Sequence, residues 1–108
     1  VPNGSAVGTD KYVYKLAWLD ALLAWLPALL QAHPQLLIVG DFNIAPDDRD
    51  VHDPDAWRDQ ILCSEPERDR LRALAALGFR DLFRDYESDA GHYSWWDYRA
   101  GAFRRNHG

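Results

Sequence analysis

The sequence predicts an α/β fold, in which helices pack on a sheet. Three observations support this prediction. An amphipathic segment covers residues 11–31, a short and fully apolar run follows at 36–39, and a second helix with a clear start signal covers 64–77. Helices that alternate with a buried strand are typical of proteins built around a central sheet.

The first predicted helix spans residues 11–31 and follows a loop rich in Gly, Ser and Thr. Its apolar side chains recur at steps of three and four, which places them on one helix face. Pro27 lacks the amide donor that a helix uses, so we expect it to kink or end the helix nearby. The apolar face consists of Tyr12, Leu16, Leu19, Leu23, Leu26 and Leu30.

The apolar run at 36–39 predicts a central strand that is buried on both faces. It ends at Gly40 and places Asp41 and Asn43 directly after its carboxyl end. Ligands usually bind at that edge of an α/β sheet. A second strand is predicted at 94–98, where aromatic residues face both sides.

The second predicted helix begins at Ser64, which can cap it, while Glu67 completes a capping box and Gly78 ends the helix. A further helical turn is expected over 79–83. Residues 44–60 are irregular and acidic. Their spacing lacks the glycine and the terminal glutamate of a calcium-binding loop, so a solvated loop is predicted there.

Composition narrows the class of protein. An apolar fraction of 47% in 108 residues excludes wholesale disorder. The net charge of −5 argues against a basic protein that coats nucleic acid, but not against an enzyme with a local site for it. The single cysteine, Cys63, allows no intrachain disulfide and fits a cytoplasmic location. Asp20 and Pro27 interrupt the longest apolar stretch, so no membrane span is expected.

The chain contains no methionine, and its first residues resemble the middle of a loop. We therefore expect residues 1–108 to be a fragment, cut at both ends, of a larger domain.

Asp41 and Asn43 are the first candidate site residues. Their side-chain oxygens are the type that Mg²⁺ prefers, and a carboxylate can also orient or deprotonate an attacking water. Asp and Asn also form turns by hydrogen bonding to the main chain, so a purely structural role stays open.

A second cluster lies at 93–99, where Trp95 and Trp96 stand side by side. An exposed tryptophan can stack on a nucleotide, whereas a buried one belongs to a core. Strand alternation predicts one of each. Lys11 and Lys15 are one helical turn apart and could contact phosphates or remain solvated.

Taken together, these segments have the order and spacing of a known family. They are Pro2-Asn3-Gly4, Lys11 and Lys15, Val39-Gly40-Asp41-Phe42-Asn43-Ile44, Asp50-Val51, Asp53-Pro54 and Trp57, the capped helix from Ser64 to Arg72, Gly78-Phe79-Arg80-Asp81-Leu82-Phe83-Arg84, and Tyr93-Ser94-Trp95-Trp96-Asp97-Tyr98-Arg99. The sequence resembles the exonuclease III family of AP endonucleases, within the endonuclease/exonuclease/phosphatase superfamily. The resemblance covers essentially the whole chain.

The resemblance implies that residues 1–108 are part of a single catalytic domain, which folds as a four-layer α/β sandwich. It also implies a Mg²⁺- or Mn²⁺-dependent phosphodiesterase that cleaves double-stranded DNA 5′ to abasic sites and trims 3′ ends, monomeric and independent of membranes. By resemblance, Asp41 activates the attacking water, and Asn43 contacts the phosphate and the metal. Asn3, Trp95, Lys11 and Lys15 then contact the substrate.

Several family site residues lie outside this sequence: a tyrosine, a metal-binding Asn and Glu, a later Asp, and an Asp-His pair. We therefore expect the isolated 108-residue chain to aggregate and to lack useful nuclease activity. Two other classes stay open. One is a superfamily phosphoesterase acting on another substrate, such as a phospholipid. The other is a non-catalytic α/β interaction module.

Overall fold

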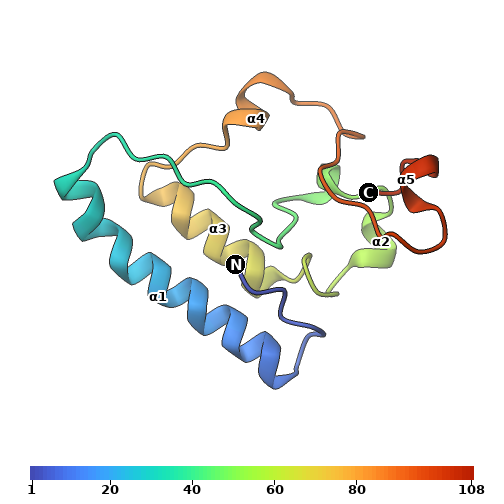
Figure 1. Cartoon of the computed structure of the whole chain (residues 1–108), viewed down its shortest axis with the longest axis horizontal. Helices are drawn as coiled ribbons and strands as arrows, with labels where there is room; N and C mark the ends of the chain where they lie inside the picture. The colour runs from blue at the N-terminus through green and yellow to red at the C-terminus, as the bar shows by residue number, and fades with distance from the viewer.

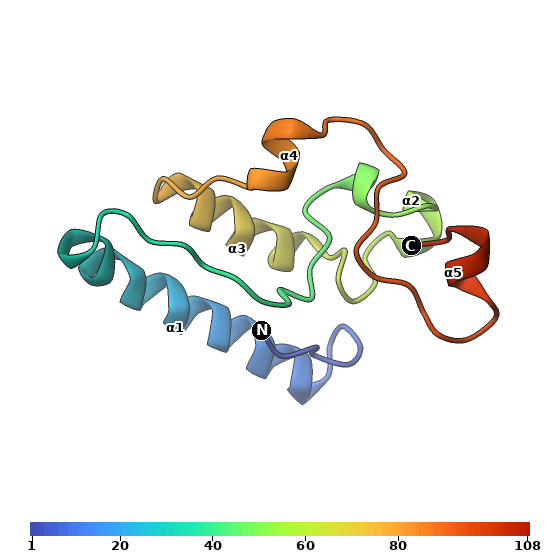
Figure 2. The ribbon, with the colours of Figure 1, turned by 45° about the horizontal axis from the view of Figure 1, so that its top comes forward.

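The computed structural model describes all residues from 1 to 108. Two long helices, α1 (Asp10–Ala32) and α3 (Glu65–Ala76), lie side by side, and the remaining chain runs across and around them (Figures 1 and 2). Four short helices punctuate these connections: η1 (Asp48–Asp50), α2 (Pro54–Trp57), α4 (Leu82–Tyr86) and α5 (Ala102–Arg105).

Helix α1 begins where the sequence predicts. Thr9 caps it by accepting a hydrogen bond from the Tyr12 amide at 3.3 Å. The predicted apolar face is confirmed, because Tyr12, Leu19 and Leu26 are buried. Pro27 does not end the helix, which continues for five residues to Ala32. The proline is exposed, so the carbonyl that loses its helical partner there can be hydrated.

Helix α3 begins with the predicted capping box, in which Ser64 and Glu67 each bond to the other's main chain. It ends before Gly78, whose φ of +104° is a conformation that favours glycine. Exposed charges also join α3 to α1, since Arg70 donates two hydrogen bonds of 3.0 Å to the carboxylate of Asp20.

The predicted α/β fold, as a fragment of a four-layer sandwich, is wrong for this chain, because residues 1–108 form no β-strand. The segments at 36–39 and 94–98 are neither helical nor paired. A strand needs main-chain hydrogen bonds to a neighbouring strand, and no second strand lies beside either segment. The short helical turn also forms later than predicted, at α4 rather than at 79–83.

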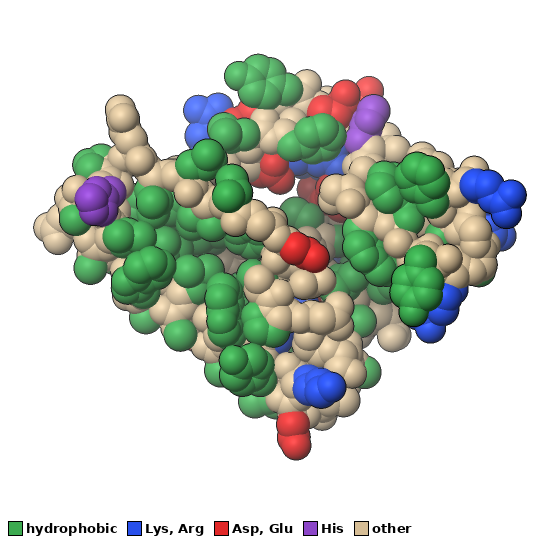
Figure 3. All heavy atoms as spheres, viewed as in Figure 1, with side chains coloured by type: hydrophobic (Ala, Val, Ile, Leu, Met, Phe, Trp, Pro, Cys, Tyr) green, Lys and Arg blue, Asp and Glu red, His purple; other side chains and the backbone are tan.

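The apolar run at 36–39 packs against the rest of the chain on one face only, and its other face is exposed. Leu36 and Ile38 are half-buried, whereas Leu37 is 68% exposed and Val39 is 80% exposed. Trp18 and Trp25 on α1 are also exposed. Figure 3 shows apolar side chains gathered over α1 and the connection that follows it. A soluble chain rarely leaves so much apolar surface in contact with water.

Helix α1 is long and apolar enough to cross a membrane, by length and composition alone. Its contacts favour a place inside a protein domain. Lys15 is fully buried in an ion pair with Glu67, and Asp20 is held by Arg70, both on α3. A helix that carries paired charges toward a neighbouring helix is typical of globular packing, because charges inside a bilayer are costly.

The exposed apolar face makes a testable prediction. We expect Leu37→Lys combined with Val39→Lys to raise the solubility of the 108-residue chain and to reduce its binding of a hydrophobic dye, because both side chains are largely in contact with water. The helical circular dichroism signal should not change. Leu26→Lys is the control, since Leu26 is buried and its replacement should reduce the helical signal. Unchanged solubility in the double variant would contradict the prediction.

Candidate active site

Two segments far apart in the sequence meet beside the first turns of α1. The amino group of Val1 donates to the Asp41 carbonyl at 3.0 Å, and Asn43 Nδ2 donates to the Val1 carbonyl at 2.9 Å. These contacts hold Val1, two residues before Asn3, against Asp41 and Asn43. The structure thus brings three predicted site residues, Asn3, Asp41 and Asn43, onto adjoining segments.

Asp41 and Asn43 form a tight turn. Asp41 Oδ1 accepts a hydrogen bond from the Asn43 amide at 2.8 Å, and Asn43 has a φ of +52°. Asparagine tolerates this left-handed conformation better than most residues. The turn-forming role considered above is therefore confirmed. It leaves the second carboxylate oxygen of the exposed Asp41, Oδ2, without a hydrogen bond to the protein.

The turn offers oxygen ligands suited to a divalent ion, although it does not enclose one. Asp41 Oδ2 and Asn43 Oδ1 accept no hydrogen bond from the protein. One carboxylate and one amide oxygen suit Mg²⁺, which completes its shell with water and phosphate oxygens. Residues 1–108 contain no group of three or more His, Cys, Asp or Glu placed to hold a metal ion. The chain therefore fits part of such a site.

Lys15 does not lie on the surface, as a phosphate-binding role would require. Its side chain is fully buried in an ion pair with Glu67 on α3. Its ammonium also donates to the Asn43 carbonyl at 2.5 Å and to the Asn3 carbonyl at 3.2 Å. The predicted contact of Lys15 with substrate is therefore corrected. Lys15 binds the main chain of both site segments, because it faces α3 rather than solvent.

Glu67 connects the same group to the start of α3. It accepts hydrogen bonds from the Leu62 amide at 3.2 Å and from the Ser64 hydroxyl at 2.6 Å. The Ser64 hydroxyl is also 2.7 Å from the hydroxyl of Tyr12 on α1. No buried side-chain polar atom in the chain lacks a partner. A buried ionic network is stable only when it is satisfied in this way.

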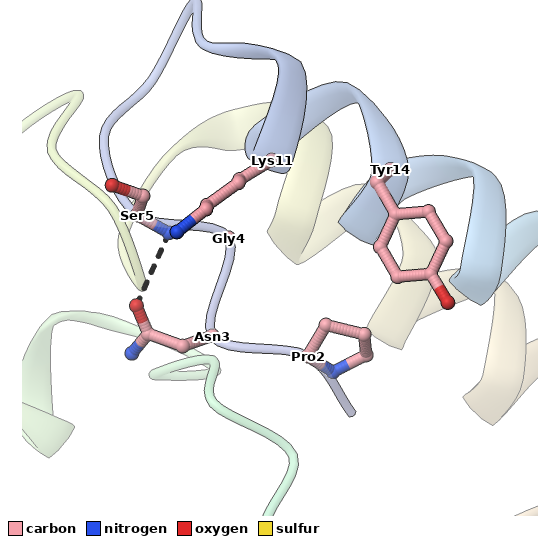
Figure 4. Close-up of a pocket in the computed structure, with 6 residues that line it drawn as sticks. All are labelled: Pro2, Asn3, Gly4, Ser5, Lys11 and Tyr14. Atoms are coloured by element: carbon pink, nitrogen blue, oxygen red, sulfur yellow. Dashed lines mark hydrogen bonds between the residues drawn. The ribbon is translucent and has the colours of Figure 1, made fainter.

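Asn3 and Lys11 line a shallow open pocket of about 380 Å³ at the amino-terminal end of α1. Figure 4 shows Lys11 extending from α1 toward Ser5 and Tyr14 lying on the side of Pro2. Asn3 Oδ1 accepts the Ser5 amide at 3.1 Å. Its amide nitrogen makes no hydrogen bond to the protein and can donate to a bound group. Lys11 is exposed, unlike Lys15.

Trp95 lies on a separate segment, and no hydrogen bond joins that segment to Asn3, Asp41 or Asn43. Trp95 is 48% exposed. Trp96 instead packs edge-on against Phe103 with ring centroids 5.1 Å apart, and its indole donates to Asn106. Trp95 is therefore available to a ligand, whereas Trp96 is half-buried against Phe103. This difference does not come from strand alternation, because residues 94–98 form no strand. The Arg99 guanidinium lowers the pKa of the neighbouring Asp97 carboxyl.

The sequence pattern does not reveal the role of Glu67 at this site. It identified Ser64 and Glu67 only as a helix start, which is their local function. In the structure Glu67 faces α1, where a buried acidic side chain needs a basic partner. Its partner, Lys15, is 52 residues away, a separation that no local pattern reveals.

Comparison of the sequence with known families identifies a class of hydrolase. The chain belongs to the endonuclease/exonuclease/phosphatase family, which matches residues 2–108.

Two individual relatives show which members of this family the chain is similar to. The chain is 39% identical over 108 residues to an exodeoxyribonuclease of Bacillus subtilis (strain 168), covering 99% of this chain and 42% of that protein. It is 32% identical over 109 residues to the DNA repair nuclease APEX1 of Danio rerio, covering all of this chain and 34% of that protein. The chain thus spans less than half the length of these relatives.

A solved structure agrees with the sequence comparison. The 3′ phosphatase NExo from Neisseria, bound to a product DNA hairpin, superposes with a TM-score of 0.96 at 37% identity. The match covers 99% of this chain and 42% of that one.

The close contact between Gly4 and Lys15 yields a second prediction. Gly4 has a φ of +89°, and a Cβ there would lie 2.7 Å from Lys15 Cδ. We expect Gly4→Ala to cost about 1–2 kcal/mol through its backbone conformation and roughly 1–3 kcal/mol more through overpacking. Gly8→Ala is a matched control, because Gly8 has a φ of +83° with open space around it. Chemical denaturation of the complete protein measures both, and equal losses would contradict the steric argument.

The buried ion pair yields a third prediction. Lys15→Met leaves the Glu67 carboxylate buried without its partner, and we expect a loss of about 3–5 kcal/mol in unfolding free energy. Adding Glu67→Gln removes the stranded charge and keeps an acceptor for the Ser64 amide, so most of the loss should be recovered. Denaturant titration of both variants tests this. A double variant as unstable as the single one would show that charge burial is not the cause.

Proposed function

We propose that the protein containing this chain is a metal-dependent DNA phosphodiesterase of repair, which cleaves 5′ to abasic sites and trims 3′ ends. The observation that carries the proposal is the turn at Asp41. A buried network holds this turn, and its free carboxylate oxygen lies on a segment adjoining the pocket of Asn3 and Lys11. The names of the relatives, an exodeoxyribonuclease and a DNA repair nuclease, support a DNA substrate.

Asp41 and Asn43 have the chemistry that phosphodiester hydrolysis requires. The oxygen of water forms a bond to phosphorus while the bond from phosphorus to the leaving oxygen breaks. Asp41 Oδ2, which accepts no hydrogen bond from the protein, would orient that water and take its proton. The side-chain oxygen of Asn43 is free to contact the metal, and the amide of Asn3 can donate to a phosphate oxygen.

A divalent cation would supply charge stabilisation at the scissile phosphate. Dependence on divalent metal is general among nucleases of this family. We propose Mg²⁺ or Mn²⁺, with Asp41 and Asn43 among the ligands, because these hard ions take oxygen donors and retain water. The remaining ligands would come from outside residues 1–108, since these contain no complete group.

Trp95 favours DNA over a lipid or another phosphate ester. Its ring is 48% exposed, on a segment that also carries the exposed Tyr98. Aromatic faces of this kind stack on bases or fill the space of a missing one. Lys11, exposed at the pocket beside Asn3, is suited to a backbone phosphate. We propose double-stranded DNA as the partner and a monomer as the working form.

The fourth prediction tests Asp41. Asp41→Asn keeps an oxygen for the Asn43 amide, so the turn should survive, but it removes the base. We expect kcat for incision of an abasic duplex to fall about 10²–10⁴-fold, measured on the complete protein with Mg²⁺. Chelation of the ion should abolish activity.

Asp81→Asn is the matched control, because Asp81 also accepts a main-chain hydrogen bond, from Arg84, and lies on the α4 cap. It should retain normal activity. Full activity in Asp41→Asn would favour a non-catalytic turn residue. Hydrolysis of a phospholipid in preference to abasic DNA would replace the proposed substrate.

A further inference from the structure

We propose that Lys15 and Glu67 are positioning residues for the reaction. Their buried ion pair fixes the main-chain carbonyls of Asn3 and Asn43, and so sets the relative placement of the two segments that carry the site. This inference rests on the proposed function. It gives Lys15 a role that a surface lysine on the same helix could not have.

The ammonium of Lys15 has no capacity left for a substrate. A lysine carries three N–H donors. In this structure they reach three acceptors: the Asn3 carbonyl, the Asn43 carbonyl and Glu67 Oε1. Because the side chain has no exposed surface, DNA cannot reach it without unfolding this region. Its effect on the reaction therefore has to be indirect.

The direction of Lys15 is set by both long helices. Its stem projects from α1, and its charge is held by Glu67 of α3. Glu67 is itself fixed, because Oε2 accepts from the Ser64 amide at 3.3 Å as well as from the Ser64 hydroxyl. The ammonium thus occupies one position relative to the helix pair. Its two other hydrogen bonds then fix the main-chain carbonyls of Asn3 and Asn43 relative to the helix pair.

The two anchored carbonyls belong to residues of the candidate site. Asn43 follows Asp41 in the tight turn, so a shift of the Asn43 carbonyl moves the turn that aims Asp41. Asn3 lines the pocket beside Lys11. Reaction rates depend steeply on such placement, and a misplacement of 1 Å can cost about 10²-fold in rate.

Two further hydrogen bonds, both at Ala45, hold the segment that follows the Asp41 turn. The Ala45 amide donates to the Leu62 carbonyl at 2.8 Å, and Arg68 Nε donates to the Ala45 carbonyl at 3.1 Å. These contacts hold the end of the segment after the turn, whereas Lys15 holds the turn itself. The segment as a whole therefore remains near α3 when Lys15 is replaced, and the expected change is a local one at Asn43.

The variant that tests the inference is Lys15→Met/Glu67→Gln in the complete protein. It leaves no unpaired buried charge, so folding is preserved while the donor to both carbonyls is lost. We expect kcat on abasic duplex DNA to fall by about 100-fold, with KM unchanged within twofold. Lys15→Arg, which keeps the charge and its donors, should retain more activity than the double variant.

Two controls separate positioning from the other roles of a lysine or an ion pair. Lys11→Met removes the exposed lysine of the same helix, and should raise KM and reduce the salt dependence of DNA binding by about one unit of slope. The double variant should leave that slope unchanged. Asp20→Asn removes the exposed ion pair between α1 and α3, and should leave kcat unchanged.

Three results would overturn the inference. The first is a folded double variant with the kcat of the unsubstituted protein, which would make the pair purely structural. The second is a raised KM together with a reduced salt dependence of DNA binding, which would indicate that Lys15 contacts DNA directly. The third is a loss of kcat in Asp20→Asn as large as in the double variant, which would indicate a general effect of helix packing.

Hydrogen exchange distinguishes a failure of this inference from a failure of the proposed function. The amides of Ser5 and Asn43 close the two turns at the anchored residues. If the unsubstituted protein cleaves no DNA, the proposed function fails. The positioning role is then decided by exchange alone: faster exchange of these two amides in the double variant supports it, and unchanged exchange refutes it.

Discussion

The buried ion pair between Lys15 and Glu67 is the interaction on which the rest of this structure depends. It joins the two long helices and binds the two segments that carry the candidate site. Burying two charges costs free energy that their attraction recovers only when every remaining donor and acceptor is paired. That condition explains why Ser64, Leu62, Asn3 and Asn43 all contribute to the network.

Local signals in the sequence predicted the helices well. The periodic apolar residues of α1 and the capping box at Ser64 depend on contacts within one or two turns, and both appear in the structure. The strands were predicted wrongly for a related reason. An apolar run such as 36–39 becomes a strand only beside another strand, and residues 1–108 contain none. Sheet formation is a property of pairs of segments.

The candidate site was predictable in part. Asp41 and Asn43 stand out because they follow an apolar run, and the structure joins them in a turn that exposes one carboxylate oxygen. The sequence contains one signal for the burial of Lys15, which follows Tyr12 by three residues and precedes Leu19 by four, at the edge of the apolar face. It contains no signal for the partner of Lys15. The packing of α3 against α1 supplies that partner, Glu67, and separates Lys15 from the exposed Lys11. One lysine is buried in the network, and the other stays at the open pocket.

The spacing of the network along the chain has a consequence for how the site forms. Lys15 contacts Asn3 12 residues earlier, Asn43 28 residues later and Glu67 52 residues later. The helices can begin to form from nearby residues, but these contacts require the closure of long loops, which comes late in folding. The network that holds the turn at Asp41 is therefore complete only after Glu67 has been synthesised. A chain whose helices have formed without these long-range contacts would therefore lack an ordered candidate site.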